Sequence, residues 1–307
     1  MDALPRILLF SVFLIIGVSI AAGAFLSGRP SVDDYVPDPV PGVVMECFQE
    51  AEPVPWSYCV NSVPGSDNPD VLYYLHARNG NETWWNDKDY HTGALYKRWR
   101  ENGQAEPTVV AISFGKLWVL KEDAAEEGGG LYKVFTDAVV PKIEERLEEN
   151  SGQRMVAGIS MGGYNALIVA MKSKGFFSKA ASVCAPMPTV SHHDGVGRVI
   201  GAARSSKTSL KRALLLWRFS QQYYPTREKW LANDPLTLSA SFDPDDAPAL
   251  YVTCGKSDDW GCFDGTEKLV GNLEKAGGAV QWVPRDGGHC DIEYPSLAEF
   301  LQSEASE

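Results

Sequence analysis

The sequence of 307 residues has no surplus of basic residues, no C-x-x-C pair, no internal repeat and no low-complexity tract. It contains 28 lysine and arginine residues against 40 aspartate and glutamate residues, so its formal net charge is −12. This excess of acid argues against binding to nucleic acid or to an anionic membrane, because phosphate recognition requires a basic surface. The missing C-x-x-C spacing argues against a zinc cluster. With 44% hydrophobic residues, the chain is apolar enough to fold around a core.

The first 24 residues have the pattern of an export signal. Arg6 precedes an apolar run from Ile7 to Ile20, and small residues follow as far as Ala24. This arrangement predicts a signal peptide that is cleaved after Ala24. The alternative is an uncleaved membrane anchor formed by residues 7–26, because about 20 residues are enough to cross a bilayer as one helix. Either reading predicts an exported protein that is secreted, periplasmic or anchored with its domain outside.

The six cysteines fit an exported chain, because an even number of cysteines in such a chain favours disulfides. Cys47 and Cys59 lie on either side of a proline-containing loop and are predicted to pair. Cys184 and Cys254 each end an apolar run, where a buried free thiol and a disulfide are both compatible with the sequence.

Apolar runs alternate with amphipathic segments along most of the chain. Residues 25–69 are predicted to form an N-terminal linker and an early β segment. From residue 70 onward, short apolar runs without polar alternation alternate with helical patterns, which is typical of parallel strands connected by helices. Residues 70–307 are therefore predicted to form one α/β domain. A segment at about 188–246 breaks the alternation and is predicted to be a helical insertion near the functional site.

The motif G-x-S-x-G occurs within Gly158–Gly163 and is centred on Ser160. An apolar strand pattern at 155–157 precedes it, and a helical pattern begins at Tyr164. This strand–turn–helix setting is typical of a nucleophile elbow, in which small flanking residues allow the sharp turn that exposes the serine hydroxyl. Ser160 is therefore the predicted nucleophile.

A serine hydroxyl needs a base that takes its proton, and the elbow predicts an acid and then a histidine further along the chain. His289 follows the last predicted strand, at 280–283, and two glycines precede it, so His289 is the predicted base. His192 and His193 also follow Ser160, but they fall in the insertion, where they are expected to be solvated or to line a pocket.

The acid is expected after the strand at 249–253, where a carboxylate reaches the far nitrogen of the imidazole and fixes its tautomer. Asp258 and Asp259 are both candidates, and only one of two adjacent side chains can point inward. If the loops that carry the acid and the histidine touch, a bridge between Cys262 and Cys290 would clamp them together.

Two backbone N–H groups are expected to hold a developing oxyanion. Met161 supplies the first, because it follows the nucleophile at the start of the helix. The second is expected from the loop after the strand at 71–75, where Arg78 is the first candidate and Ala77 the next.

Taken together, these residues resemble the "Putative esterase" branch of the α/β-hydrolases, which includes esterase D, the antigen-85 mycolyltransferases and some feruloyl esterases. The resemblance extends over about residues 71–300 and is carried by residues 71–76, Gly158–Gly163, Asn233-Asp234-Pro235-Leu236, Cys254-Gly255-Lys256-Ser257-Asp258 and Gly288-His289. It implies an α/β-hydrolase fold, with a mostly parallel sheet between two layers of helices. The Cys-Gly-x-x-Asp pattern of the family implies that Asp258 is the acid. The chain departs from the family at His76-Ala77, where His-Gly is common.

The expected function is that of an exported serine esterase with a triad of Ser160, His289 and Asp258 and no metal or organic cofactor. The expected substrate is a small-molecule or polysaccharide-linked carboxylic ester. Two alternatives fit the same residues: an acyltransferase that passes the acyl group to another alcohol, and a non-catalytic binding protein on a hydrolase scaffold.

Overall fold

The computed structural model describes residues 40–86, 93–147, 152–206 and 208–303. The predicted signal or anchor and the predicted linker as far as residue 39 lie outside these ranges. Within the described ranges, no helix is both long enough and apolar enough to cross a lipid bilayer.

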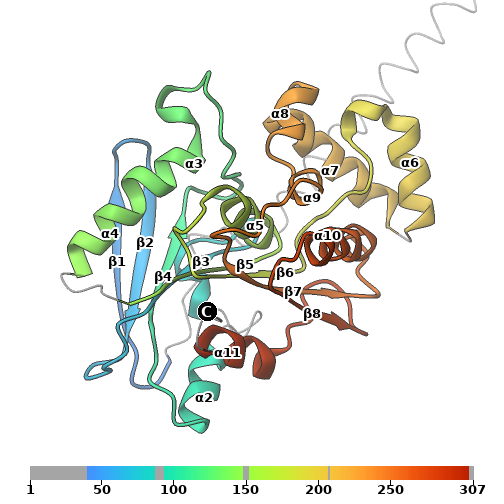
Figure 1. Cartoon of the computed structure of the whole chain (residues 1–307). Helices are drawn as coiled ribbons and strands as arrows, with labels where there is room; N and C mark the ends of the chain where they lie inside the picture. Colours follow the sequence, from blue (N-terminus) through green and yellow to red (C-terminus); the bar gives the residue numbers. More distant parts are fainter. Residues whose placement is uncertain (1–39, 87–92, 148–151, 207, 304–307) are drawn as a thin grey trace, which may run out of the picture. The chain divides into compact units, whose positions relative to one another are not determined.

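One sheet of eight strands forms the centre of the described residues (Figure 1). In chain order the strands are β1 Val44–Glu50, β2 Trp56–Ser62, β3 Val71–Leu75, β4 Thr108–Ser113, β5 Arg154–Ile159, β6 Lys179–Val183, β7 Ala249–Gly255 and β8 Val280–Arg285. Their order across the sheet is β1-β2-β4-β3-β5-β6-β7-β8. The β1–β2 and β2–β4 pairs are antiparallel and all other pairs are parallel. The predicted fold class, a mostly parallel α/β sheet, is confirmed.

The burial of the strands follows from their places in the sheet. Every residue of β3 and β6 is buried, as expected for parallel strands that are covered on both faces. By contrast, every residue of the edge strand β1 is exposed or only partly buried. The early β segment therefore consists of two strands, and both belong to the same sheet as the strands that follow residue 70.

Helices cover both faces of the sheet (Figure 1). On one face, α5, α10 and the helical stretch 131–147 bury side chains such as Phe135, Leu167 and Leu269 in one apolar cluster. On the opposite face, α2 and α11 contribute Trp99 and Leu301 to a second cluster. The bounds are α2 Ala94–Glu101, α3 Leu131–Val134, the π-helical turn η4 Phe135–Val139, α4 Val140–Leu147, α5 Met161–Lys172, α10 Phe263–Lys275 and α11 Tyr294–Gln302. Two short 3-10 turns are η2 Glu82–Asn86 and η3 Glu127–Gly129.

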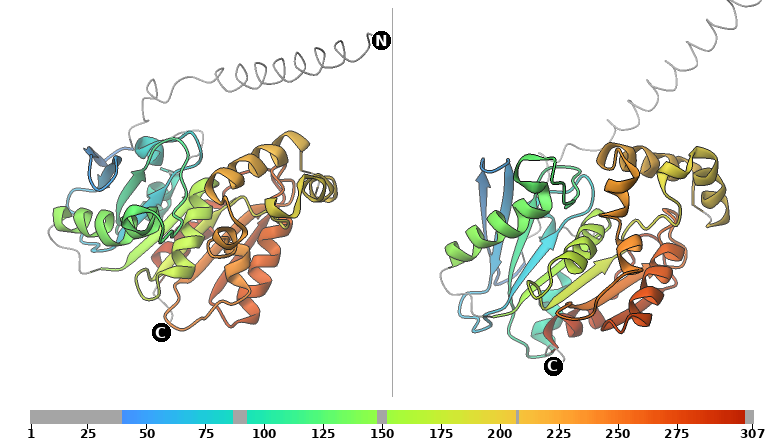
Figure 2. Two further views of the ribbon diagram at one scale, coloured as in Figure 1. Left: turned by 90° about the horizontal axis from the view of Figure 1, so that it is seen from above. Right: turned by 45° about the horizontal axis from the view of Figure 1, so that its top comes forward.

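The predicted insertion at about 188–246 is helical. It contains the 3-10 turn η5 His192–Asp194 and the helices α6 Val196–Ser205, α7 Leu210–Tyr223, α8 Arg227–Leu231 and α9 Pro235–Ser239. Helices α6 and α7, coloured yellow to light orange, pack against each other (Figure 2), whereas α9 packs against α5 and α10. Ser209 caps α7 by accepting a hydrogen bond from the N–H of Arg212, and Asp234 caps α9 in the same way through the N–H of Thr237.

Two disulfides are present among the described residues. Cys47 and Cys59, directly opposite each other on β1 and β2, are bonded as predicted. The second bond joins Cys184 to Cys290, so the predicted bridge between Cys262 and Cys290 is wrong. Cys254 and Cys262 are buried free thiols. Cys262 is the N-cap residue that precedes α10, and its thiol lies against Cys254, whereas Cys290 reaches across to the end of β6.

Candidate active site

Ser160 lies in the sharp turn between β5 and α5, with a φ of 54° that non-glycine residues rarely adopt. Two backbone hydrogen bonds hold the turn: the N–H of Ser160 donates to Val183 over 2.8 Å, and the N–H of Tyr164 donates to Ser160 over 3.0 Å. The strained conformation is typical of a nucleophile elbow.

The glycines around Ser160 are required by close backbone contacts. A Cβ atom on Gly162 would overlap the carbonyl group of Leu75 at the end of β3, and one on Gly158 would overlap the backbone of Gly162. Because the obstructing atoms belong to the backbone, they cannot rotate away as a side chain would. The small residues of the motif therefore allow α5 to begin directly against the neighbouring strand.

Three of the predicted side chains meet at the carboxyl ends of β5, β7 and β8. Nε2 of His289 lies 3.1 Å from Oγ of Ser160, and Nδ1 of the same ring lies 2.7 Å from Oδ2 of Asp258. An ionised carboxylate only accepts hydrogen bonds, so Nδ1 carries the proton and Nε2 is free to accept the serine proton. This is the arrangement of a nucleophile, a base and an orienting acid.

Asp258 and Asp259 have opposite environments, which separates the two candidate acids. The Asp258 side chain is 0% exposed, whereas the Asp259 side chain is 54% exposed and forms an ion pair with Arg212. Oδ1 of Asp258 also accepts a 2.8 Å hydrogen bond from the N–H of Trp260. A buried carboxylate needs such partners, and His289 and Trp260 supply them.

The loops that carry the acid and the histidine are joined by backbone hydrogen bonds. The N–H of Ser257 donates to Gly287 over 3.0 Å, and the N–H of Lys256 donates to Arg285 over 2.7 Å. The disulfide from Cys184 to Cys290 adds a covalent link to the same region, one residue beyond His289. Position 184 directly follows β6, the strand that pairs with β5 and β7, but Cys254 also lies at the end of a neighbouring strand, so strand adjacency alone does not select Cys184 as the partner.

The loop after β3 packs against the first turn of α5, as the contact of Gly162 with Leu75 and His76 indicates. Its turn is closed by a 3.0 Å hydrogen bond from the N–H of Gly80 to Ala77. Arg78 lies within this turn, and its guanidinium group covers the ring of Phe219 on α7 at 5.6 Å. Met161 is the first residue of α5. The assignment of the two backbone N–H groups of Met161 and Arg78 to an oxyanion hole stays a prediction.

His76 has a structural environment. Its Nδ1 lies 2.7 Å from the carbonyl oxygen of Ala77 and therefore donates, so Nε2 accepts from Ser113 at 2.9 Å and from the indole N–H of Trp118 at 3.3 Å. Burial lowers the pKa of His76 to about 4, so the ring is neutral near pH 7.

The two remaining candidate histidines do not join the triad. His192 and His193 both contact the carbonyl oxygen of Tyr224, at 2.9 and 3.1 Å. His192 is buried and lines a pocket in the insertion, and His193 is partly buried.

Potential metal ligands also gather at the triad, because one ligand atom each of Asp258, Cys262 and His289 lies within 4.8 Å of the others. Burial raises the pKa of the Cys262 thiol well above its usual range, which keeps this sulfur protonated and a poor metal ligand. The aspartate and the histidine are already hydrogen-bonded to each other. The donor set therefore suits proton transfer better than metal binding.

The sheet order, the elbow and the serine–histidine–aspartate geometry together define an α/β-hydrolase. A family model described as "Putative esterase" matches residues 54–295, and the chain belongs to this family. The predicted assignment to the serine esterases of the α/β-hydrolase superfamily is confirmed.

Solved structures of esterases have the same fold. A ferulic acid esterase is 19% identical, with a TM-score of 0.59 over 84% of this chain and 95% of its own. An S-formylglutathione hydrolase from Agrobacterium tumefaciens is 17% identical, with a TM-score of 0.57 over 87% and 94%. The corresponding enzyme from Staphylococcus aureus is 16% identical, with a TM-score of 0.54 over 84% and 96%. A comparison of the sequence with curated proteins gives no match.

Proposed function

We propose that this protein is an exported carboxylic-ester hydrolase that works through an acyl-enzyme on Ser160. The observation that carries the proposal is the pair of contacts made by His289, 3.1 Å to the serine hydroxyl and 2.7 Å to the buried carboxylate of Asp258. One imidazole is thus placed to accept a proton on one side while its other nitrogen is held by a fixed acceptor.

The first half of the proposed reaction transfers the acyl group to the enzyme. Oγ of Ser160 attacks the ester carbonyl while Nε2 of His289 takes the hydroxyl proton. The backbone N–H groups of Met161 and Arg78 stabilise the tetrahedral oxyanion. His289 then gives its proton to the alcohol oxygen, the bond between the carbonyl carbon and that oxygen breaks, and the alcohol leaves.

In the second half, water replaces the alcohol. His289 takes a proton from the water as the water oxygen attacks the acyl carbon. The bond between that carbon and Oγ of Ser160 then breaks, His289 returns the proton to Oγ, and the carboxylic acid leaves. Asp258 stabilises the imidazolium ion that forms in each half. The names of the ferulic acid esterase and the S-formylglutathione hydrolases support ester and thioester acyl groups as the substrate class.

Export is supported by the sequence pattern at residues 1–24 and by the two disulfides, which persist in oxidising compartments. Whether the apolar segment is removed or retained as an anchor at residues 7–26 is tested by N-terminal sequencing of the exported protein. A mature end after Ala24 supports the signal peptide, and an intact end supports the anchor.

The catalytic proposal is tested with the variant Ser160→Ala. Ser241→Ala makes the same change at an exposed serine outside the proposed site and is the control. We expect Ser160→Ala to lower kcat/KM for p-nitrophenyl acetate by at least about 10⁴-fold and to abolish labelling by a fluorophosphonate probe. The control variant should keep both the hydrolytic activity and the labelling. A folded Ser160→Ala variant with undiminished hydrolysis would disprove the assignment, and product analysis with added alcohol separates hydrolysis from acyl transfer.

A further inference from the structure

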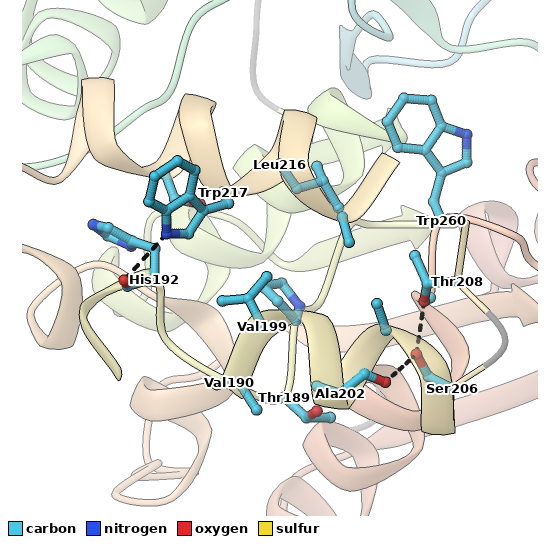
Figure 3. A pocket seen from close by; sticks show the side chains of 15 residues that line it. Thr189, Val190, His192, Val199, Ala202, Ser206, Thr208, Leu216, Trp217 and Trp260 are labelled. Carbon is cyan, nitrogen blue, oxygen red and sulfur yellow. Dashed lines mark hydrogen bonds between the residues drawn. The ribbon is translucent and has the colours of Figure 1, made fainter. Parts of the chain in front are cut away.

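A pocket lies between the helical insertion and the loop that carries the proposed acid. It is partly open to solvent. Helices α6 and α7 form two of its walls, with Ala202 and Leu216 among the lining residues. Trp217 and Trp260 approach from different sides of the pocket (Figure 3).

Several polar groups of the pocket wall are already paired within the protein, whereas Nδ1 of His192 is buried without a partner. The indole N–H of Trp217 donates to the carbonyl of His192 over 3.3 Å. The hydroxyl of Ser206 lies 2.6 Å from that of Thr208 and 2.9 Å from the carbonyl oxygen of Ala202 (Figure 3). Most of the other lining residues are apolar, which favours an apolar ligand group.

Trp260 connects this pocket to the proposed catalytic residues. The residue lines the pocket, and its ring lies against the imidazole of His289, with 5.6 Å between the ring centroids. Its backbone N–H donates to Asp258, and the next N–H, that of Gly261, donates to the carbonyl of Asp258 over 3.2 Å. The pocket is therefore on the histidine side of the site.

The position of the pocket beside His289 determines which part of an ester it can bind. In acyl transfer His289 must give its proton to the alcohol oxygen, so the alcohol lies on the side of the imidazole. We propose that the pocket between α6 and α7 binds the alcohol part of the substrate and selects esters of apolar, ring-sized alcohols. This inference rests on the proposed function.

The test compares two ester series, so that the two sides of the substrate are separated. Methyl acetate and phenyl acetate differ only in the alcohol, whereas methyl acetate and methyl hexanoate differ only in the acyl group. The variant Ala202→Phe narrows the pocket. Ser205→Phe adds the same side chain at an exposed position of α6 that does not line the pocket, and is the matched control.

We expect Ala202→Phe to lower the ratio of kcat/KM for phenyl acetate to that for methyl acetate at least tenfold, and to leave the acyl ratio within about twofold of the wild type. Ser205→Phe should change neither ratio. Leu216→Ala enlarges the pocket and should raise the preference for 2-naphthyl acetate over phenyl acetate, so the inference is testable even if Ala202→Phe does not fold.

Unchanged alcohol ratios in folded Ala202→Phe and Leu216→Ala would overturn the inference, as would a change confined to the acyl series. Neither result affects the proposed function. Conversely, wild-type hydrolysis that does not depend on Ser160 would overturn the proposed function itself, and the two failures are therefore distinguishable.

Discussion

Cys290, the residue that follows His289, is joined by a disulfide to Cys184 at the end of β6. The preceding residue of that strand, Val183, accepts the backbone hydrogen bond from Ser160. One covalent bond thus connects the loop of the proposed base to the strand that supports the proposed nucleophile. The bond closes a segment of 106 residues, long enough for a large effect on the unfolded state.

We expect the double variant Cys184→Ser/Cys290→Ser to lose both stability and activity. In the chain-entropy model, a loop of this length contributes roughly 4–5 kcal/mol to the free energy of unfolding. A freed histidine loop should also lower kcat, by about 10²-fold if the imidazole moves by about 1 Å. Thermal unfolding and steady-state kinetics measure the two effects.

The matched control removes the other disulfide, between Cys47 and Cys59 on β1 and β2. This bond spans 12 residues at the edge of the sheet, so its loss should lower the melting temperature with little change in kcat. An unchanged kcat in folded Cys184→Ser/Cys290→Ser would show that the bond at the site serves stability alone.

Adjacent aspartates give a second test of the site. Asp258→Asn replaces a buried acceptor of the His289 proton with an amide that favours the wrong tautomer, and should lower kcat about 10⁴-fold. Asp259→Asn changes an exposed side chain and should alter kcat less than about threefold. Kinetics of the two purified variants at pH 7.5 decide the assignment. The reverse pattern would show that Asp259 is the acid.

The sequence reveals the nucleophile because its evidence is local. The residues of the elbow at Gly158–Gly163 are contiguous, and the steric need for Gly158 and Gly162 comes from backbone contacts within or beside the turn. The strands β3, β4, β5 and β7 are equally visible, because burial on both faces makes them nearly continuous apolar runs. The sequence also places the base after the last strand, where β8 ends.

Other features depend on contacts that the local sequence does not specify. The two loops predicted to touch do touch, through Ser257 and Gly287, yet the cysteines near them bond elsewhere or remain free. Six cysteines allow 15 connectivities, and only the direction of each side chain chooses among them. Strand β1 is hard to predict from the sequence, because its position at the sheet edge leaves it largely exposed and it therefore lacks a continuous apolar run. The pocket is formed by helices brought together only in the folded chain.

Burial of His76 predicts an acid-dependent loss of stability. The unfolded chain binds a proton on this imidazole below pH 6.5, whereas burial lowers the pKa in the folded protein to about 4. Between these values the unfolded state holds more protons. The contribution of the neutral His76 ring to the free energy of unfolding is therefore complete above pH 6.5 and falls as the pH is lowered towards 4. A difference of this size corresponds to roughly 3 kcal/mol at full extent.

Asp234 opposes this effect, since burial raises the pKa of its carboxyl group from 3.8 to about 6. Its folded form binds a proton first, so this residue favours the folded state as the pH falls below 6. The wild-type protein therefore has a shallower pH dependence than His76 alone would give. A comparison of the wild type with a His76 variant isolates the contribution of this histidine to stability, because Asp234 contributes equally in the two proteins.

We expect His76→Gln to be less stable than the wild type at pH 7, because an amide cannot reproduce the imidazole contacts with Ala77, Ser113 and Trp118. The deficit should shrink by roughly 2–3 kcal/mol between pH 7 and pH 4.5, since only the wild type loses the histidine contribution. Urea unfolding at pH 7.0, 5.5 and 4.5 measures the change. Parallel stability curves for the two proteins would show that His76 protonates equally in the folded and unfolded states, and hence that the neutral ring does not support the loop after β3.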